Sequence, residues 1–442
     1  MPTTTNPRGL PSHLTILLII AVLIGGGGIA YGLANLTVQL AAIALLAINR
    51  EAFVSFWRSS VLPLRILVTL TILLPIVHLI PLPPIMWSAL PGRELAVDAR
   101  AAIGPLLWHP ISLDSGRTLV SVLGLIVPLV ILVIGISASS RTLIGAGWTV
   151  VALGLANFAL GTAQVLYPNS NWFLFPENPM TGVLFGTFAN RNSTGIFLVV
   201  CLSLLLHLPE LGPATRSKLA RTGAGLLLVL AIILTQSRSA MALAAIPLVS
   251  AMLRWAPQKL LNMGLGRGAI AKAVLATLGA IAAALALAPG SRLESSLERF
   301  AIGNEARQYI WEDAAYSSRK YWPVGSGMGT FDEVFQVDES LENLSTKTAG
   351  RAHNDYLELA IEGGLAGLLL ITAWALTIAW ACWQARALPD PWLAWIGGLI
   401  WLIIGFQSIS DYPLRNQAML ATAAYALALI FRSHKGARAA PL

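Results

Sequence analysis

The chain has 442 residues, of which 56% are hydrophobic and only 11% are charged, and its mean hydropathy is +0.71. A soluble domain carries about a quarter charged residues, so this composition excludes a soluble protein. The net charge of +8 does not indicate a nucleic-acid partner, because the basic residues are not clustered as a binding face requires. Cys201 and Cys382 both lie in apolar runs, which argues against a disulfide framework and a cysteine metal site.

Apolar runs of about 18 residues recur along the chain, each long enough to cross a hydrocarbon layer of about 30 Å as a helix. The first run, residues 14–30, lacks an A-x-A-like cleavage site and is followed at once by others, so we expect a retained helix. The sequence predicts an all-α polytopic membrane protein with about 12 transmembrane helices. The predicted spans are residues 14–31, 33–48, 64–81, 118–137, 142–166, 193–208, 222–236, 239–253, 270–288, 356–383, 392–408 and 417–431.

The charges of the connecting segments determine the predicted orientation. With the N-terminus inside, the inward segments hold 16 basic and 3 acidic residues, whereas the outward segments hold 13 basic and 18 acidic residues. This asymmetry follows the positive-inside rule, so we expect both termini on the cytoplasmic side. The inward loops are short and contain no nucleotide-binding loop, which argues against cytoplasmic ATP chemistry.

Three outward segments are long, at residues 81–116, 167–192 and 289–355. The first contains Trp87 and Trp108, which suit a membrane interface. The third is the longest, and its mixture of charged and aromatic residues predicts a folded, partly helical periplasmic loop subdomain. The expected organisation is residues 1–288 with the first nine spans, 289–355 as the loop subdomain, and 356–442 with the last three spans and a basic cytoplasmic tail.

Arg238 lies between two apolar runs with almost no loop around it, in Thr-Gln-Ser-Arg-Ser-Ala at 235–240. An arginine at the membrane boundary can extend to lipid phosphate, or it can bind an anionic ligand within the bundle. The second interpretation suits the guanidinium, which binds phosphate through two nitrogens and keeps its charge.

Arg191 lies where the second outward segment re-enters the membrane. Asn190, Asn192 and Ser193 can cap the next helix and leave backbone N–H groups free for an anionic oxygen. The alternative is an ordinary helix cap beside a solvated arginine.

His353 lies at the outer boundary of a predicted span, in Arg351-Ala-His-Asn-Asp-Tyr-Leu-Glu358. Histidine accepts a proton near neutral pH, so His353 is the best general-base candidate of the six histidines. A histidine at an interface can also be structural.

Asp411 and Arg415 lie in the short outward turn between the last two spans. They could pair with each other and cap a helix, or they could orient a catalytic residue.

These arginines and this histidine all map to the outer ends of spans. An outward pocket with positive charge and one base suits the diphosphate head group of a membrane lipid, because the charge stabilises the leaving diphosphate. No cluster has obvious metal-ligand spacing, and the adjacent Asp332 and Glu333 are expected to be solvated. We therefore expect a metal-independent mechanism without a cofactor.

The sequence resembles the O-antigen ligase and polymerase superfamily. The resemblance rests on motifs between residues 186 and 414, and the first third of the chain adds only hydropathy. The motifs are Gly186-Thr-Phe-Ala-Asn-Arg-Asn, Thr235-Gln-Ser-Arg-Ser, Trp311 with Pro323-Val-Gly-Ser-Gly-Met-Gly-Thr-Phe331, Arg351 to Glu358, Ala360-Ile-Glu-Gly-Gly-Leu-Ala-Gly367, and Asp411-Tyr-Pro-Leu.

The resemblance implies an inverting bacterial inner-membrane glycosyltransferase of the C type, with its active site in the periplasm. The implied donor is a glycan on undecaprenyl diphosphate, and the acceptor is lipid A-core, another lipid-linked glycan or a protein side chain. By motif, His353 would activate the acceptor hydroxyl and Arg191 and Arg238 would hold the diphosphate. Arg351 would assist them, and Asn354, Asp411 and Arg415 would support the site.

Several functions remain open at this point. Polymerase and ligase share topology, and we favour the polymerase slightly; other polysaccharide assembly proteins are candidate partners. A transporter or flippase for a lipid-linked oligosaccharide would use the same arginines without a base, although no internal repeat is visible. A structural scaffold would need neither the arginines nor His353.

Overall fold

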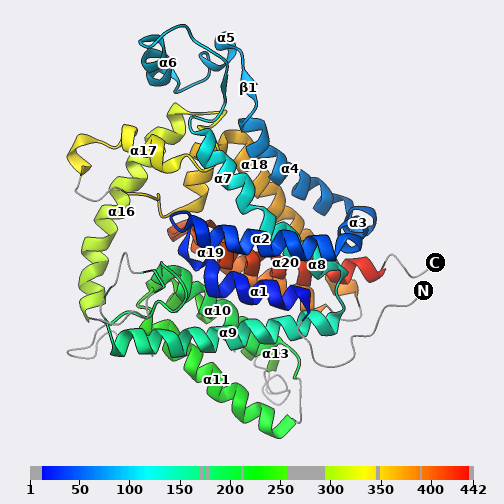
Figure 1. The fold of residues 1–442 in the computed structure, drawn as a ribbon. Helices are drawn as coiled ribbons and strands as arrows, with labels where there is room; N and C mark the ends of the chain where they lie inside the picture. The colour runs from blue at the N-terminus through cyan, green and yellow to red at the C-terminus, as the bar shows by residue number, and fades with distance from the viewer. Residues whose placement is uncertain are drawn as a thin grey trace, which may run out of the picture.

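The structure is a computed structural model that describes residues 12–168, 174, 175, 180, 182–210, 214–255, 294–344, 349–388 and 391–437. These residues are mostly helical (Figure 1). The helices are α1 (His13–Ile24), α2 (Gly32–Ile48), α3 (Arg50–Ser59), α4 (Leu62–His78), α5 (Pro84–Trp87), α6 (Glu94–Ala101), α7 (Ser115–Gly124), α8 (Ile126–Ser137), α9 (Ser140–Leu166), α10 (Arg191–His207), α11 (Ala214–Leu234), α12 (Arg238–Leu243), α13 (Ala245–Trp255), α16 (Glu294–Lys320), α17 (Phe331–Asp338), α18 (Asp355–Gln384), α19 (Trp392–Ser410) and α20 (Gln417–Ala437). Two short strands, β1 (Pro81–Leu82) and β2 (His109–Pro110), pair antiparallel.

The apolar helices form one bundle. Helices α1, α2, α8, α9 and α20 run alongside one another (Figure 1), and α1 ends beside the start of α20. Helix α10 is buried on nearly every face, which explains why its sequence is apolar all round. Helices α16 and α17 lie at the opposite end from the start of α1.

Four helices among the described residues are long and apolar enough to cross a membrane, or five if the bent pair α2 and α3 forms one span. They are Ser115–Ser137, Ser140–Leu166, Asp355–Ala387 and Trp392–Ser410. The other predicted spans within the described residues overlap helices that do not pass this test alone. The span predicted at 270–288 lies outside the described residues, and the total of 12 stays a prediction.

The first helix is shorter than the span predicted for residues 14–31. Helix α1 ends at Ile24, a 3-10 turn covers Gly25–Gly27, and Gly28 has φ +74°. A Cβ on Gly26 would lie 2.0 Å from the Thr187 carbonyl oxygen, so the glycines let the segment before α10 pass close by. The backbone N–H of Ala189 donates to the Gly26 carbonyl at 3.1 Å, which fixes the chain just ahead of Arg191.

The third outward segment contains α16 and α17, as its composition led us to expect. A small hydrophobic core separate from that of the bundle joins α16, α17 and the start of α18; its buried members are Ala314, Tyr321, Phe331, Val334, Phe335, Ala352 and Ile361. Asp332 and Glu333, which we expected to be solvated, are 32% and 29% exposed, and both also form ion pairs with Arg117 at the start of α7. The domain boundaries stay a prediction.

Helix α18 is broken at Gly364, where φ is +54°. The break exposes the carbonyls of Ile361 and Glu362, which accept hydrogen bonds from the backbone N–H groups of Ser326 at 2.8 Å and Gly327 at 3.0 Å. A Cβ on Gly364 would lie 2.2 Å from the Pro323 carbonyl oxygen. The glycine-rich loop after α16 is thus docked against the break in α18. This contact fixes the direction of the first turns of α18.

Candidate active site at the start of helix α18

His353 and Asp411 form the centre of the candidate site. His353 Nδ1 lies 3.1 Å from Asp411 Oδ1; the carboxylate is 1% exposed and the imidazole 31%. A carboxylate can only accept, so Nδ1 carries the hydrogen and Nε2 is the nitrogen able to take a proton. The interpretation in which Asp411 pairs with Arg415 is wrong, because Asp411 contacts His353 instead.

The backbone at His353 is held in an unusual conformation. His353 has φ +50°, in the left-handed region that few residues other than glycine adopt. Asn354 follows as the N-cap of α18, and its Oδ1 accepts hydrogen bonds from the N–H groups of Tyr356 at 3.0 Å and Leu357 at 3.1 Å. Backbone strain of this kind is common at functional sites.

The backbone N–H and the backbone carbonyl of Ala352, the residue before His353, each form a hydrogen bond with a side chain. The Ala352 N–H donates to Glu358 Oε1 at 2.9 Å, and Trp311 Nε1 on α16 donates to the Ala352 carbonyl at 2.8 Å. The Tyr412 ring lies 5.0 Å from the imidazole, centroid to centroid. The position of His353 therefore depends on α16, α18 and the turn after α19 together.

Arg415 is the centre of a buried ion cluster beneath this site. Its Nη1 lies 2.9 Å from Glu362, its Nη2 3.1 Å from Glu358 and its Nε 3.3 Å from Asp355. Burial alone would lower the pKa of the guanidinium, but the carboxylates of Glu362, Glu358 and Asp355 outweigh it and raise the pKa. Arg415 thus supports the site by joining the turn after α19 to the first turns of α18.

Arg351 is partly engaged in the same cluster. Its Nη1 donates to Glu358 Oε2 at 3.1 Å, and its guanidinium carbon lies 6.0 Å from the centre of the Tyr412 ring. Part of its charge is thereby offset, so Arg351 is a weaker candidate for anion binding than its sequence position implied.

The start of helix α10 meets the same aspartate. Asn190 caps α10 by accepting from the Asn192 N–H at 2.8 Å, as predicted, and its Nδ2 lies 3.5 Å from Asp411 Oδ2. Asn416 Nδ2 also donates to Ser193 Oγ at 3.4 Å. Arg191, the first residue of α10, therefore stands next to a residue that contacts the His353 partner.

Arg238 begins a helix that packs against the first turns of α10. Ser237 caps α12 by accepting from the Ala240 N–H at 3.4 Å. A Cβ on Gly195 would lie 2.6 Å from the Ala240 Cβ and 3.1 Å from the Ser237 Cβ, so α10 and α12 approach closely there. The helix starts that carry Arg191 and Arg238 are consequently neighbours.

Arg307 is a further cation, and sequence analysis did not select it. The pKa of Arg238 is lowered, first by burial and then by the positive charge of Arg307. Arg307 lies one helical turn before Trp311 on α16, so both side chains are on one face of the helix. The sequence held a signal for Arg307, because this residue lies four positions before Trp311, which was already part of a motif.

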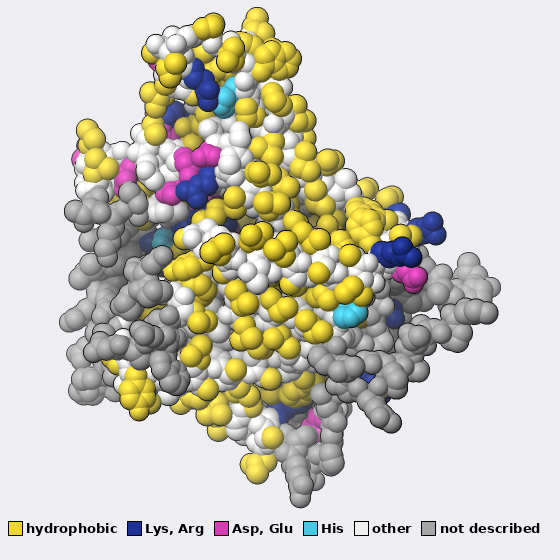
Figure 2. Space-filling view, in the orientation of Figure 1, with side chains coloured by type: hydrophobic (Ala, Val, Ile, Leu, Met, Phe, Trp, Pro, Cys, Tyr) yellow, Lys and Arg dark blue, Asp and Glu magenta, His cyan; other side chains and the backbone are white. Residues whose placement is uncertain are grey.

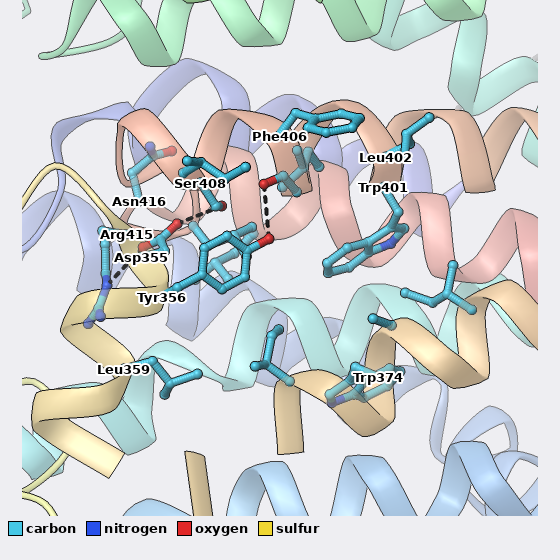
Figure 3. Close-up of a pocket in the computed structure, with 18 of the residues that line it drawn as sticks. Asp355, Tyr356, Leu359, Trp374, Trp401, Leu402, Phe406, Ser408, Arg415 and Asn416 are labelled. Atoms are coloured by element: carbon cyan, nitrogen blue, oxygen red, sulfur yellow. Dashed lines mark hydrogen bonds and ion pairs between the residues drawn. The ribbon is translucent and has the colours of Figure 1, made fainter. Parts of the chain in front are cut away.

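A long cavity of about 1120 Å³ opens beside the ion cluster, mainly between α18 and α19. Figure 3 shows Asp355 and Arg415 at one end, and aromatic rings such as those of Trp374 and Trp401 farther along. Tyr356 crosses it to donate to the Gly405 carbonyl at 2.9 Å. Arg351 lines the polar end, but Arg191, Arg238 and His353 are not among its lining residues.

Among the described residues, no group of three or more histidine, cysteine or carboxylate side chains is suited to hold a metal ion. The carboxylates of Asp355, Glu358 and Glu362 converge on Arg415 instead.

A protein-family model described as O-antigen ligase matches residues 223–372. The matched segment contains Arg238, Arg307, Arg351 and His353, whereas Arg191, Asp411 and Arg415 lie outside it. No curated protein matches the chain. The match confirms the resemblance inferred from the motifs, and it is confined to residues 223–372.

Proposed function

We propose that this protein is a glycosyltransferase of the periplasmic face of the bacterial inner membrane. It transfers a glycan from undecaprenyl diphosphate to the hydroxyl of an acceptor. The observation that carries this proposal is the contact between His353 Nδ1 and Asp411, 3.1 Å long, at the start of α18. His353 lies within the segment that matches the family model. A buried carboxylate that accepts a hydrogen bond from one imidazole nitrogen fixes the orientation of the ring, and the other nitrogen can then act as a general base.

In the proposed reaction, His353 Nε2 accepts the proton of the acceptor hydroxyl as its oxygen attacks the anomeric carbon of the donor. The bond between that carbon and the diphosphate oxygen breaks, and its electron pair stays on the diphosphate. Attack opposite the leaving group inverts the anomeric centre. Asp411 keeps the imidazole in the tautomer that the step requires and stabilises the imidazolium that forms.

The arginines take the charge of the leaving diphosphate. Arg191 and Arg238 begin neighbouring helices, and the positive charge of Arg307 on α16 acts on Arg238. Like charges held together repel each other, and an anion bound between them removes that repulsion. Arg351 contributes less, because Glu358 already shares its charge.

The apolar cavity between α18 and α19 suits the polyprenyl chain of the donor. Its walls are mainly aliphatic and aromatic, and its polar end lies at Arg351 and Asp355. A hydrocarbon chain in this cavity would place its head group toward the start of α18. Asn354 and Arg415 would then support the site by fixing the helix cap and the ion cluster.

The acceptor distinguishes polymerase from ligase, and we favour the polymerase only slightly. Genes for polymer export beside this one would favour polymerisation, and genes for lipid A-core would favour ligation. A flippase would bind the same head group but would not need the dyad of His353 and Asp411.

The test is glycan transfer by the purified protein in liposomes that contain the undecaprenyl-diphosphate glycan and an acceptor. His353→Ala should abolish transfer while the protein remains folded and still binds donor. His13→Ala is the matched control, because His13 contacts Asn49 and lies far along the chain from the family domain. We expect the wild type to keep its activity in the presence of a chelator.

Other outcomes would change the proposal. If His353→Ala transfers glycan like the wild type, the base is not His353. If the wild type moves donor across the membrane without transferring glycan, the protein is a flippase. If activity is lost with chelator and restored by a metal ion, the metal-independent mechanism is wrong.

A further inference from the structure

Residues 81–110 form a compact lobe between α4 and α7. Strands β1 and β2 close it, since Pro81 pairs with Pro110 and Leu82 with His109. Trp87, expected at a membrane interface, is instead fully buried and donates to the Leu107 carbonyl at 2.9 Å.

The lobe is fixed to the site through Arg93. This buried side chain donates to the carbonyl of Ile111 at 2.6 Å and to that of Gly325, in the docked glycine-rich loop, at 2.9 Å. The Leu113 N–H also donates to the Ser326 carbonyl at 2.9 Å. The lobe is therefore a rigid extension of the loop that sets the direction of α18.

Large apolar side chains nevertheless cover the outside of this rigid lobe. Ile103 is 90% exposed, Leu107 72% and Trp108 67%. Ile85, Met86 and Leu95 are exposed as well. A fixed surface with this many exposed apolar groups marks an interaction site, because a soluble surface of this size rarely shows them together.

The position of the lobe indicates its partner. In Figure 1, α5 and α6 lie beyond the ends of α4 and α7 and to one side of the long helices α1, α2 and α9. Helix α4 leads into the lobe and presents exposed apolar side chains along its length, among them Leu70, Leu73, Val77 and Ile80. Figure 2 shows hydrophobic side chains along this helix and over the tip of the lobe. The surface of α4 that would face lipid thus continues onto the lobe.

We propose that the lobe inserts its apolar tip into the membrane leaflet on the side of His353. Ile103 and Leu107 would lie among the acyl chains, and Trp108 would lie at the level of the head groups, which its ring prefers. The exposed Arg100 on α6 is available to a lipid phosphate. This inference does not depend on the proposed function, since it rests only on exposed side chains and their position beside the helices.

The test is site-specific labelling in nanodiscs. In a background of Cys201→Ala and Cys382→Ala, an environment-sensitive fluorophore is attached to Ile103→Cys or Leu107→Cys. Val337→Cys on α17, also an exposed apolar position, is the matched control. At both lobe positions we expect a blue-shifted emission and at least two-fold quenching by nitroxide-labelled lipids. At position 337 we expect neither effect.

Quenching at 103 and 107 no greater than at 337 would overturn the proposal. A blue shift that grows with protein density in the nanodisc and is insensitive to the nitroxide lipid would assign the lobe to a second copy of the chain, and would also overturn it. If the protein with both cysteines replaced does not fold, the wild-type cysteines are retained. The fluorescence of a labelled protein that lacks the new cysteine is then subtracted as background.

Discussion

Arg415 and Arg238 are arginines at the same end of the bundle, yet their surroundings shift the pKa of each guanidinium in opposite directions. Burial acts on both, but three carboxylates raise the pKa of Arg415, whereas burial and the positive charge of Arg307 lower that of Arg238. One arginine is surrounded by opposite charge within the protein. The other stands beside a second positive charge.

This difference separates an arginine that stabilises the fold from one that is suited to a ligand. Arg415 joins three carboxylates of one helix to the turn after α19, and each of its three guanidinium nitrogens contacts a carboxylate. The positive charge of Arg307 acts on Arg238, and like charges brought together in this way are typical of a functional site. The following substitutions test this comparison.

Arg415→Ala should have the largest effect on stability. It leaves buried carboxylates without their partner, which costs about 3–5 kcal/mol in a buried pair. Arg238→Ala should change the free energy of unfolding by less than about 1 kcal/mol, because it also removes the repulsion from Arg307. Thermal unfolding of both variants in the same detergent measures the difference. Equal losses of stability would mean that the two arginines do not differ in role.

Arg238→Ala and Arg307→Ala should each lower glycan transfer about 10-fold to 100-fold, because a hydrogen bond to a charged group contributes about 1.5–3 kcal/mol. Arg238→Lys should retain part of the activity, since it keeps the charge and loses the two-nitrogen geometry. Initial rates at several donor concentrations measure the loss. A full rate in Arg307→Ala would remove Arg307 from the site.

Gly364→Ala should lower the free energy of unfolding by about 1–3 kcal/mol, because the added Cβ overlaps the Pro323 carbonyl in a left-handed backbone. The substitution would weaken the ion cluster of Arg415, because the break at Gly364 positions Glu362. Gly223→Ala on α11, where a Cβ meets nothing within 4 Å, is the control and should be neutral or slightly stabilising. Chemical or thermal unfolding measures the stability of the two variants. Equal changes in stability would contradict this prediction.

Much of the helical architecture could be predicted from hydropathy alone, since apolar runs longer than a membrane is thick have few other folds. The helix start at Asn190 was also predicted, because its side chain caps the helix locally, whereas the caps at Ser237 and Asn354 were not identified. The early end of α1 was missed, although its four glycines signal a break.

The partners of the charged residues were not predictable. Asp411 and Arg415 are four residues apart, and sequence spacing suggested that they pair; tertiary packing instead brings Asp411 to His353 and Arg415 to α18. The approach of Arg307 to Arg238 is likewise a long-range contact with no local pattern. Charges reveal that a site exists, but only the fold decides which of them are neutralised.

The most direct test of the catalytic proposal is chemical rescue of His353→Gly. Glycine accepts φ +50° without strain, so the backbone and the cap at Asn354 should be preserved while the imidazole is removed. We predict that transfer falls by about 100-fold or more and that free imidazole restores it in proportion to its concentration. A variant that transfers glycan at the wild-type rate without imidazole would contradict the account.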